Sequence, residues 1–346
     1  MKTIKDIAKE ANVSTGTVDR VLHNRGGVSK KTEEEIKRLL KRNNFKTNII
    51  ARSLAMKKNI KIATLLPSFN EENIFWKAPL IGIGLAQEEV EIFGVKVQNF
   101  EFDQFKVSTY LSEFKALLDS KPDGVIIVPT FRKETQQIVL KLEQHNIPYI
   151  FLNIDIEGFK NISFIGQDSY KSGFLAGKLM HLCLQDAGSI LIIQTRSSID
   201  DNNAISKRIS GFTDYFSEKK ANIKINKVNT SNLDNTSALI EKLSSILKKD
   251  SSIRGVFVPN SKISIFADCI EELKFQKLSL IGFDGTEQNI RCLKEDKVSF
   301  LISQKPVKQG YKSIKLMTNY LLEKKQPPFK IYSPMEILTK ENINFS

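Results

Sequence analysis

The sequence predicts an all-α helix-turn-helix headpiece followed by a two-lobed α/β body with two doubly wound parallel sheets. Two observations lead to this fold class. Up to about residue 60, short helical runs alternate with polar turn residues, and from Lys61 onward short apolar strands alternate with amphipathic helical segments. In addition, the 346 residues exceed what one hydrophobic core usually organises, so we expect two or three packed units.

Three helices are predicted within the first 46 residues. Thr3 followed by Asp6 is typical of a capping box, Ser14 is suited to cap a second helix, and Ser29 or Thr32 a third. One apolar face of each helix is predicted to contribute to a small shared core, formed by Ile4, Ile7, Ala8, Ala11, Val18, Val21, Leu22, Ile36, Leu39 and Leu40. A helix-turn-helix supported by a third helix is the simplest arrangement.

Positive charge is concentrated in the same part of the chain. Residues 1–60 contain 15 Lys and Arg against 6 Asp and Glu, so they hold +9 of the total net charge of +13. This asymmetry favours a small basic module that binds a polyanion, joined to a nearly neutral body. A lysine-rich solvated face is the alternative explanation.

The body is predicted from apolar strands that recur between helical segments such as 107–119, 169–186 and 234–249. The strands are KIATLL, VKVQNFEF, DGVIIVP, PYIFLN, SILIIQ, IKINKV, RGVFVPN and LSLIGFD. Strands near 163–166 and 299–303 are predicted to end where the chain crosses between the lobes. Because ligands of open α/β sheets bind at the carboxyl ends of strands, we expect a ligand cleft between the lobes.

The cysteines favour neither a disulfide framework nor a zinc site. Cys183, Cys269 and Cys292 are odd in number, far apart and without CxxC spacing. The N-terminus MKTIKDIAKEA has no continuous apolar run, and no stretch is long enough to span a membrane. We expect a cytoplasmic, nucleoid-associated protein with no membrane contact and no metal.

Signatures of catalysis are also missing from the sequence. His23, His145 and His181 lie apart, no GxxxxGK[ST] motif occurs, and GIG at 82–84 lacks the third glycine of a dinucleotide fingerprint. We therefore expect a protein that is not an enzyme and needs no cofactor.

The N-terminal motifs carry a family resemblance. TIKDIAKEANVSTGTVDRVLHNRGGVSKKTEEEIKRLLKRNNF and, further on, NIIARSLA resemble the DNA-binding headpiece of the lactose-repressor (LacI/GalR) family. The resemblance implies a helix-turn-helix DNA-binding domain over 1–46, a hinge helix and linker over 47–59, and an effector-binding and dimerisation domain over 60–346. It also implies a homodimer that binds a pseudopalindromic operator in double-stranded DNA.

The resemblance implies that the second helix enters the major groove, where small residues permit a close approach to base edges. Arg20 would pair with a guanine, and Asp19 would either accept from a cytosine amino group or form a local ion pair. In the hinge, Asn48 would cap the helix and Leu54 would insert into the minor groove, although Thr47 stands where the family usually has proline. A plain basic linker is the alternative for the hinge. The expected DNA contacts are Thr3, Ser14, Thr15, Gly16, Thr17, Asp19, Arg20, Asn24, Arg52 and Leu54.

Over residues 60–340 the chain resembles the ribose-type branch of the periplasmic sugar-binding proteins. This resemblance implies that Phe75 and Trp76 in NIFWKAPLIG sandwich a sugar ring and that Asn73 orients their loop. Core packing of the two aromatic residues is the alternative. Asn153 would bind sugar hydroxyls, with Asp155 as an alternative position.

Four further positions complete the effector site that the resemblance implies, namely Arg208, Asn260, Asp284 and Gln304. The function expected from both resemblances is a DNA-binding transcriptional regulator of carbohydrate metabolism, controlled by a monosaccharide bound between the lobes. The alternatives are a small-molecule sensor without a DNA function and a regulator with a non-sugar effector such as a purine.

Overall fold

The computed structural model describes residues 4–22, 26–43, 59–195, 203–230, 233–275 and 277–343. At the N-terminus, α1 (Ile4–Glu10), α2 (Thr15–Leu22) and α3 (Lys30–Arg42) confirm the three predicted helices. Their core is the predicted one, with Ile7, Val18 and Ile36 fully buried at its centre. The hinge helix expected over residues 48–55 lies outside the described residues.

The ends of these helices are held by side-chain caps. The Ser14 hydroxyl accepts from the Thr17 N–H at 3.1 Å at the start of α2. Ser29, and not Thr32, is the N-cap of α3, since its hydroxyl accepts from the Thr32 N–H at 3.2 Å. Between α1 and α2 the chain turns at Asn12, whose φ of 53° lies in the left-handed region that Asn tolerates.

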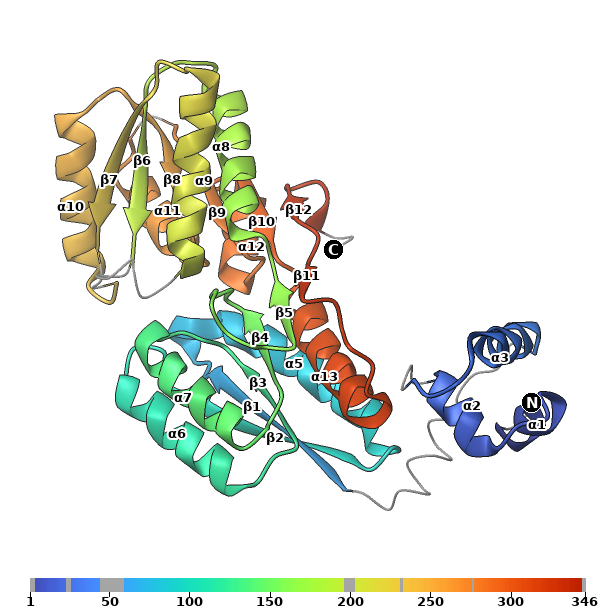
Figure 1. Ribbon diagram of the computed structural model, residues 1–346. Helices are drawn as coiled ribbons and strands as arrows, with labels where there is room; N and C mark the ends of the chain where they lie inside the picture. The colour runs from blue at the N-terminus through green and yellow to red at the C-terminus, as the bar shows by residue number, and fades with distance from the viewer. Residues whose placement is uncertain are drawn as a thin grey trace.

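The body consists of two α/β lobes, seen above one another in Figure 1. The first lobe contains β1 (Ile60–Pro67), the 3₁₀ helix η1 (Glu71–Trp76), α5 (Lys77–Glu91), β2 (Val95–Phe102), α6 (Val107–Asp119), β3 (Gly124–Ile127), α7 (Arg132–Gln144), β4 (Tyr149–Asn153) and β5 (Ser163–Gly166). The second contains α8 (Ser169–Leu184), β6 (Ser189–Gln194), α9 (Asn203–Lys219), β7 (Lys224–Asn229), α10 (Thr236–Lys249), β8 (Ile253–Phe257), α11 (Ile263–Glu272), β9 (Ser279–Phe283), α12 (Glu287–Lys294) and β10 (Phe300–Ser303). The chain ends with α13 (Pro306–Glu323), β11 (Lys330–Tyr332) and β12 (Glu336–Leu338).

Both sheets are doubly wound, as predicted. The strand orders are β11-β5-β4-β3-β1-β2 and β12-β10-β9-β8-β6-β7, and all neighbours are parallel except β10 and β12. Within each lobe the first five strands follow the same order, with the second strand at the edge beside the first. The order reverses at the first strand, which creates a topological switch point at its carboxyl end.

The chain crosses between the lobes three times. The crossings after β5 and after β10 confirm the two predicted ones, because β5 leads into α8 of the second lobe and β10 leads into α13, which packs on α5 of the first (Figure 1). The third crossing joins β11 to β12 and was not predicted, since strands of three residues produce too little periodicity to identify. Three connecting segments therefore define the hinge between the lobes.

In each lobe, two helices beside this hinge pack closely against each other, α8 with α9 and α5 with α13. A Cβ atom at Gly173 of α8 would collide with the carbonyl of Arg208 in α9, and one at Gly82 of α5 would collide with the carbonyl of Val307 in α13. Glycine therefore allows both helix pairs to approach backbone to backbone. In the second lobe this packing fixes the part of α9 that carries Arg208.

Within the described ranges, no helix combines the length and the apolar character needed to cross a bilayer.

Candidate functional site

A cavity of about 540 Å³ lies between the two lobes, at the carboxyl ends of their strands. Eight of the nine predicted effector residues line it, with the first lobe contributing Asn73, Phe75, Trp76 and Asn153, the second contributing Arg208, Asn260 and Asp284, and the crossing after β10 contributing Gln304. Hydrogen-bonding side chains from both lobes and from the hinge therefore meet around one space.

Two of these residues have an unusual backbone conformation. Asn153 directly ends β4 and Asp284 directly follows β9, with φ values of 66° and 67°. This left-handed conformation is uncommon for residues other than glycine, but Asn and Asp adopt it more readily than most. The two lobes thus end a strand in the same way at the cavity, and the conformation explains why Asn and Asp suit these positions.

A buried arginine and a buried carboxylate form the polar centre of the second lobe. Arg208 and Asp284 are each only 5% exposed. The guanidinium stacks on the Phe283 ring at 3.9 Å and donates to the Pro259 carbonyl at 3.0 Å, while its Nε atom has no hydrogen-bond partner among the described residues. Buried donors are usually paired, so the unpartnered Nε atom sets Arg208 apart from the other buried polar side chains of the lining.

The pKa values of both groups are shifted by this environment. Burial raises the pKa of the Asp284 carboxyl to about 6, although the Arg208 charge and the hydrogen bond from Gln304 lower it in part. Burial also lowers the pKa of Arg208 to about 10, opposed by the Asp284 charge. At neutral pH the site therefore holds a guanidinium and a carboxylate whose ionisation is disfavoured by desolvation.

The raised pKa predicts a pH-dependent stability. Between pH 3.8, the ordinary value, and about 6, native Asp284 holds a proton that the unfolded chain has released, so stability falls as pH rises through this window. Asp284→Asn removes the ionisable group and hence this slope. We expect the stability of Asp284→Asn, measured relative to the wild type, to be roughly 1–3 kcal/mol higher at pH 7 than at pH 4.5. Thermal unfolding of both proteins at the two pH values measures the difference, and parallel pH profiles would contradict the prediction.

A chain of amide side chains connects the first lobe to this pair through the hinge. Asn153 Nδ2 donates to Gln304 Oε1 at 3.2 Å, and Gln304 Nε2 donates to Asp284 Oδ1 at 2.8 Å. Gln309, at the start of α13, donates to the Gln304 carbonyl at 2.7 Å. A ligand that contacts Asn153 or Asp284 therefore contacts a network that spans both lobes.

Two more of the predicted residues are held by local hydrogen bonds. Asn73 lies within η1, and its Nδ2 donates to the carbonyl of Ser68, directly after β1, at 3.0 Å. Asn260 Nδ2 donates to Thr195 Oγ1 at 2.6 Å, and its Oδ1 accepts from the Lys262 N–H at 3.1 Å. Asn260 thereby joins the ends of β6 and β8.

The expected aromatic sandwich does not occur. The Phe75 and Trp76 rings meet edge to face, with centroids 5.0 Å apart and planes at 82°, so no sugar ring fits between them. Trp76 is only 6% exposed and packs in the first lobe's core, although it also lines the cavity. Phe75 packs against the same core, so the core-packing alternative holds in part for both residues. Consecutive residues of a 3₁₀ helix do not face each other across a gap, which explains why the sandwich does not form.

Asp155 does not belong to the cavity lining. Its carboxylate bonds the Lys330 ammonium of β11 at 2.8 Å, and the cavity instead includes Asn153. Between the two alternative positions, the structure therefore places Asn153 at the cavity and Asp155 in an ion pair beside the hinge.

Further residues line the cavity that were not predicted as site residues. They include Gln104, Phe105, Thr195, Asp234, Lys262 and Gln288. Gln104 and Thr195 follow β2 and β6 closely, so the carboxyl-end rule applied to every strand would have identified them. The other four lie in loops or on a helix, where the sequence pattern offered no comparable signal.

The predicted DNA-contacting residues that the structure describes lie at and along α2. Ser14, Thr15, Gly16 and Arg20 are exposed, and Thr17 and Asp19 are half-buried. A Cβ atom at Gly16 would meet only the Ser14 hydroxyl, at 3.6 Å, so packing does not require glycine there. Thr3, Asn24, Arg52 and Leu54 lie outside the described residues.

The acidic, histidine and cysteine side chains were the other candidates for a functional cluster. The part of the chain that the structure describes contains no group of three His, Cys, Asp or Glu side chains able to hold a metal ion. His181 bonds Asp186 at 2.7 Å and Tyr215 at 3.1 Å, and His145 bonds the Lys141 carbonyl at 2.9 Å. His23 is outside the described residues.

Comparison with known proteins agrees with this architecture. Residues 62–325 match the periplasmic binding protein domain, and residues 3–48 match the lacI family of bacterial regulatory proteins. A crystal structure from Bacteroides fragilis, of a protein assigned to the LacI transcriptional regulators, superposes with a TM-score of 0.76 at 28% identity and covers 84% of this chain and 100% of that one.

Two curated relatives are ribose operon repressors. The one from Halalkalibacterium halodurans is 27% identical over 291 residues, which are 82% of this chain and 81% of that repressor. The one from Lactococcus lactis is 29% identical over 224 residues, which are 65% of this chain and 62% of that repressor, so this match spans less than two thirds of the relative. The chain belongs to the lacI family of bacterial regulatory proteins, with a periplasmic binding protein domain as its body.

Proposed function

We propose that this transcriptional regulator is controlled by a free monosaccharide bound in the cavity between the lobes. The observation that carries the proposal is the convergence of hydrogen-bonding side chains from both lobes on one cavity, with Arg208 and Asp284 buried at its centre. A sugar presents many hydroxyl groups that both donate and accept. Paired amides, a carboxylate and a guanidinium match such a ligand, and analogues that lack a hydroxyl leave buried groups unpaired.

The charge of the cavity favours a neutral sugar over a phosphorylated one. Arg208 and Lys262 supply positive charge among the lining residues described, and Asp284 and Asp234 supply negative charge. These charges are balanced in number, so a dianionic phosphate would face two carboxylates as well as two cations. The names of the two ribose operon repressors support a pentose as the first sugar to test.

A thermal-shift screen of the purified protein tests this proposal. A molecule that binds only the folded state raises the melting temperature, by an amount that grows with its concentration relative to Kd. The screen compares D-ribose and other free pentoses, hexoses, uronic acids, sugar phosphates and purines. Binding of a free sugar supports the proposal, and binding confined to purines or phosphates contradicts it.

Trp76 offers an independent readout of the same binding. It is the single tryptophan of the chain and lines the cavity, so tryptophan fluorescence comes from this one position beside the proposed ligand. A sugar that raises the melting temperature is expected to change this fluorescence with the same Kd.

We also propose the domain organisation expected from the sequence. Residues 1–46 would bind DNA, 47–59 would form the hinge helix and linker that follow the DNA-binding domain, and 60–346 would bind the effector and dimerise. A two-fold dimer would bind a pseudopalindromic operator, and lobe closure would change the spacing of the two headpieces. Such coupling requires the sugar to bind one lobe arrangement more tightly than the other.

Exposed apolar residues on α5 support a dimer contact there. Ile81 and Leu85, with Ile92 just after the helix, are all at least 48% exposed and fall on one helical face.

We expect Leu85→Asp to convert the dimer to monomers, because the interface would have to bury a charge. Sedimentation velocity measures the outcome. Leu182→Asp on α8, which is 65% exposed, is the matched control, and equal dimerisation of both variants would contradict the assignment.

A further inference from the structure

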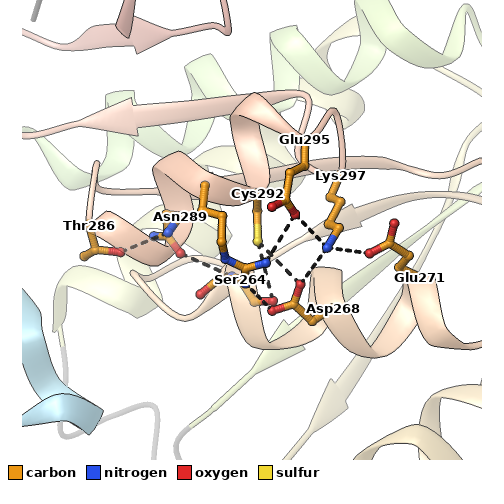
Figure 2. Close-up of polar contacts among 9 residues, drawn as sticks. Ser264, Asp268, Glu271, Thr286, Asn289, Cys292, Glu295 and Lys297 are labelled. Carbon is orange, nitrogen blue, oxygen red and sulfur yellow. Dashed lines mark hydrogen bonds and ion pairs between the residues drawn. The ribbon is translucent and has the colours of Figure 1, made fainter. Parts of the chain in front are cut away.

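A fully buried asparagine lies behind the cavity and does not line it. Asn289 is in α12, is 0% exposed and is absent from the cavity lining. Figure 2 shows its side chain between Thr286 and Ser264. A buried amide in the first turn of a helix has a desolvation cost that must be offset by hydrogen bonds, so its partners indicate its role.

Every hydrogen-bonding atom of the Asn289 side chain is used. Its Nδ2 atom carries two hydrogens, which are shared among three carbonyls, those of Ser261 at 3.0 Å, Phe283 at 3.0 Å and Asp284 at 2.9 Å. Its Oδ1 atom accepts from the Ser264 N–H at 3.2 Å. Three carbonyls on one side and an N–H on the other permit only one orientation of the amide.

These partners belong to two separate segments of the cavity wall. Ser261 follows Asn260 in the connection between β8 and α11, Ser264 lies in the first turn of α11, and Asp284 follows Phe283 at the end of β9. Ser261, Ser264 and Asp284 line the cavity, whereas Phe283 lies behind them. One side chain from a third segment therefore holds the Asn260 loop and the Asp284 backbone at a fixed separation.

We propose that Asn289 is a positioning residue of the effector cavity. It fixes the position of Asp284 relative to the 260–264 segment. This inference rests on the proposed function of the cavity. A site that recognises hydroxyl groups needs its donors and acceptors held within about 0.5 Å of the productive geometry. Loss of Asn289 would leave three buried carbonyls without this donor and release the loop.

A neighbouring ion-pair network provides the control, because it holds the same two helices without touching the cavity wall. Lys297 bonds Glu271 at 2.5 Å, Glu295 at 2.7 Å and Asp268 at 3.2 Å (Figure 2). Lys297 is only 17% exposed, so Lys297→Met is expected to loosen the contact between α11 and α12. A merely structural role of Asn289 would make both variants behave alike.

The experiment compares Asn289→Ala and Lys297→Met with the wild type in three measurements: the melting temperature, the Kd for D-ribose from Trp76 fluorescence, and hydrogen exchange of the amides in 260–264. Both variants are expected to melt at lower temperature. Asn289→Ala is expected to weaken D-ribose binding at least about tenfold, whereas Lys297→Met changes it less than about twofold. Exchange in 260–264 is expected to accelerate only in Asn289→Ala.

Each alternative result has a defined meaning. Unchanged D-ribose affinity in Asn289→Ala, or equal losses in both variants, would overturn the inference. If the wild type does not bind D-ribose or any other sugar, the proposed function fails, and exchange in 260–264 alone then decides whether Asn289 positions the loop. Should Asn289→Ala not fold, Asn289→Ser takes its place in the same measurements. Serine retains one hydroxyl donor, so the loss of D-ribose affinity is expected to be smaller than the loss expected for Asn289→Ala but larger than that of Lys297→Met.

Discussion

Replacing Arg208 with alanine is expected to weaken sugar binding at least about 100-fold and to abolish the response of DNA binding to sugar. The guanidinium is 95% buried against the second lobe, its Nε donor has no partner among the described residues, and it is the cation that faces Asp284. Alanine would remove every donor of this group and leave the buried carboxylate without a compensating charge. Trp76 fluorescence measures the loss of sugar binding.

The control for this prediction is Lys207→Ala, which removes one positive charge from the adjacent position of α9. Lys207 does not line the cavity. Sugar affinity is expected to stay at the wild-type value in this variant, and both variants should bind operator DNA normally without sugar. A wild-type response to sugar in Arg208→Ala would remove Arg208 from the proposed site.

Replacing Arg20 with alanine is expected to weaken specific operator binding by about 10- to 100-fold. Arg20 is exposed on α2, the helix that the family resemblance places in the major groove. A bidentate contact between arginine and guanine contributes roughly 1–3 kcal/mol of discrimination, which corresponds to this range. The operator is first selected from random duplexes with the full-length protein, and its Kd is then measured by fluorescence anisotropy.

Arg38→Ala separates base recognition from general electrostatics. Arg38 is exposed on α3 and pairs with Glu35 at 3.2 Å, so its loss removes the same charge from a different helix. Both variants should lose similar affinity for nonspecific DNA, because that binding depends on counterion release. If Arg20→Ala weakens specific and nonspecific binding equally, Arg20 does not read a base.

The main features of the fold could be predicted from the sequence because they depend on local periodicity. Each of the eight quoted strands recurs in the structure, and the predicted segment 107–119 coincides with α6. The family resemblance implies the strand-end residues Asn153, Asp284 and Gln304, and they meet at one cavity because parallel strands bring their carboxyl ends to one edge of a sheet. This rule depends on topology alone and needs no side-chain detail.

The errors and omissions come from contacts between distant parts of the chain and from local backbone geometry. The partner of Asp155 is Lys330 on a strand of three residues, and no periodic pattern relates the two. The edge-to-face contact of Phe75 and Trp76 results from a 3₁₀ segment with a non-helical residue, Asn73, inside it. Asn289 gave no signal, since a polar residue in a helix is ordinarily solvent-exposed.

The most direct test of the account measures the Kd of the full-length protein for its selected operator with and without a sugar that Trp76 fluorescence shows to bind. If the cavity controls DNA binding, the operator Kd changes at least about tenfold, in one direction or the other, and this change is absent from Arg208→Ala. A sugar that saturates the cavity and leaves the operator Kd unchanged would contradict control of DNA binding by this site.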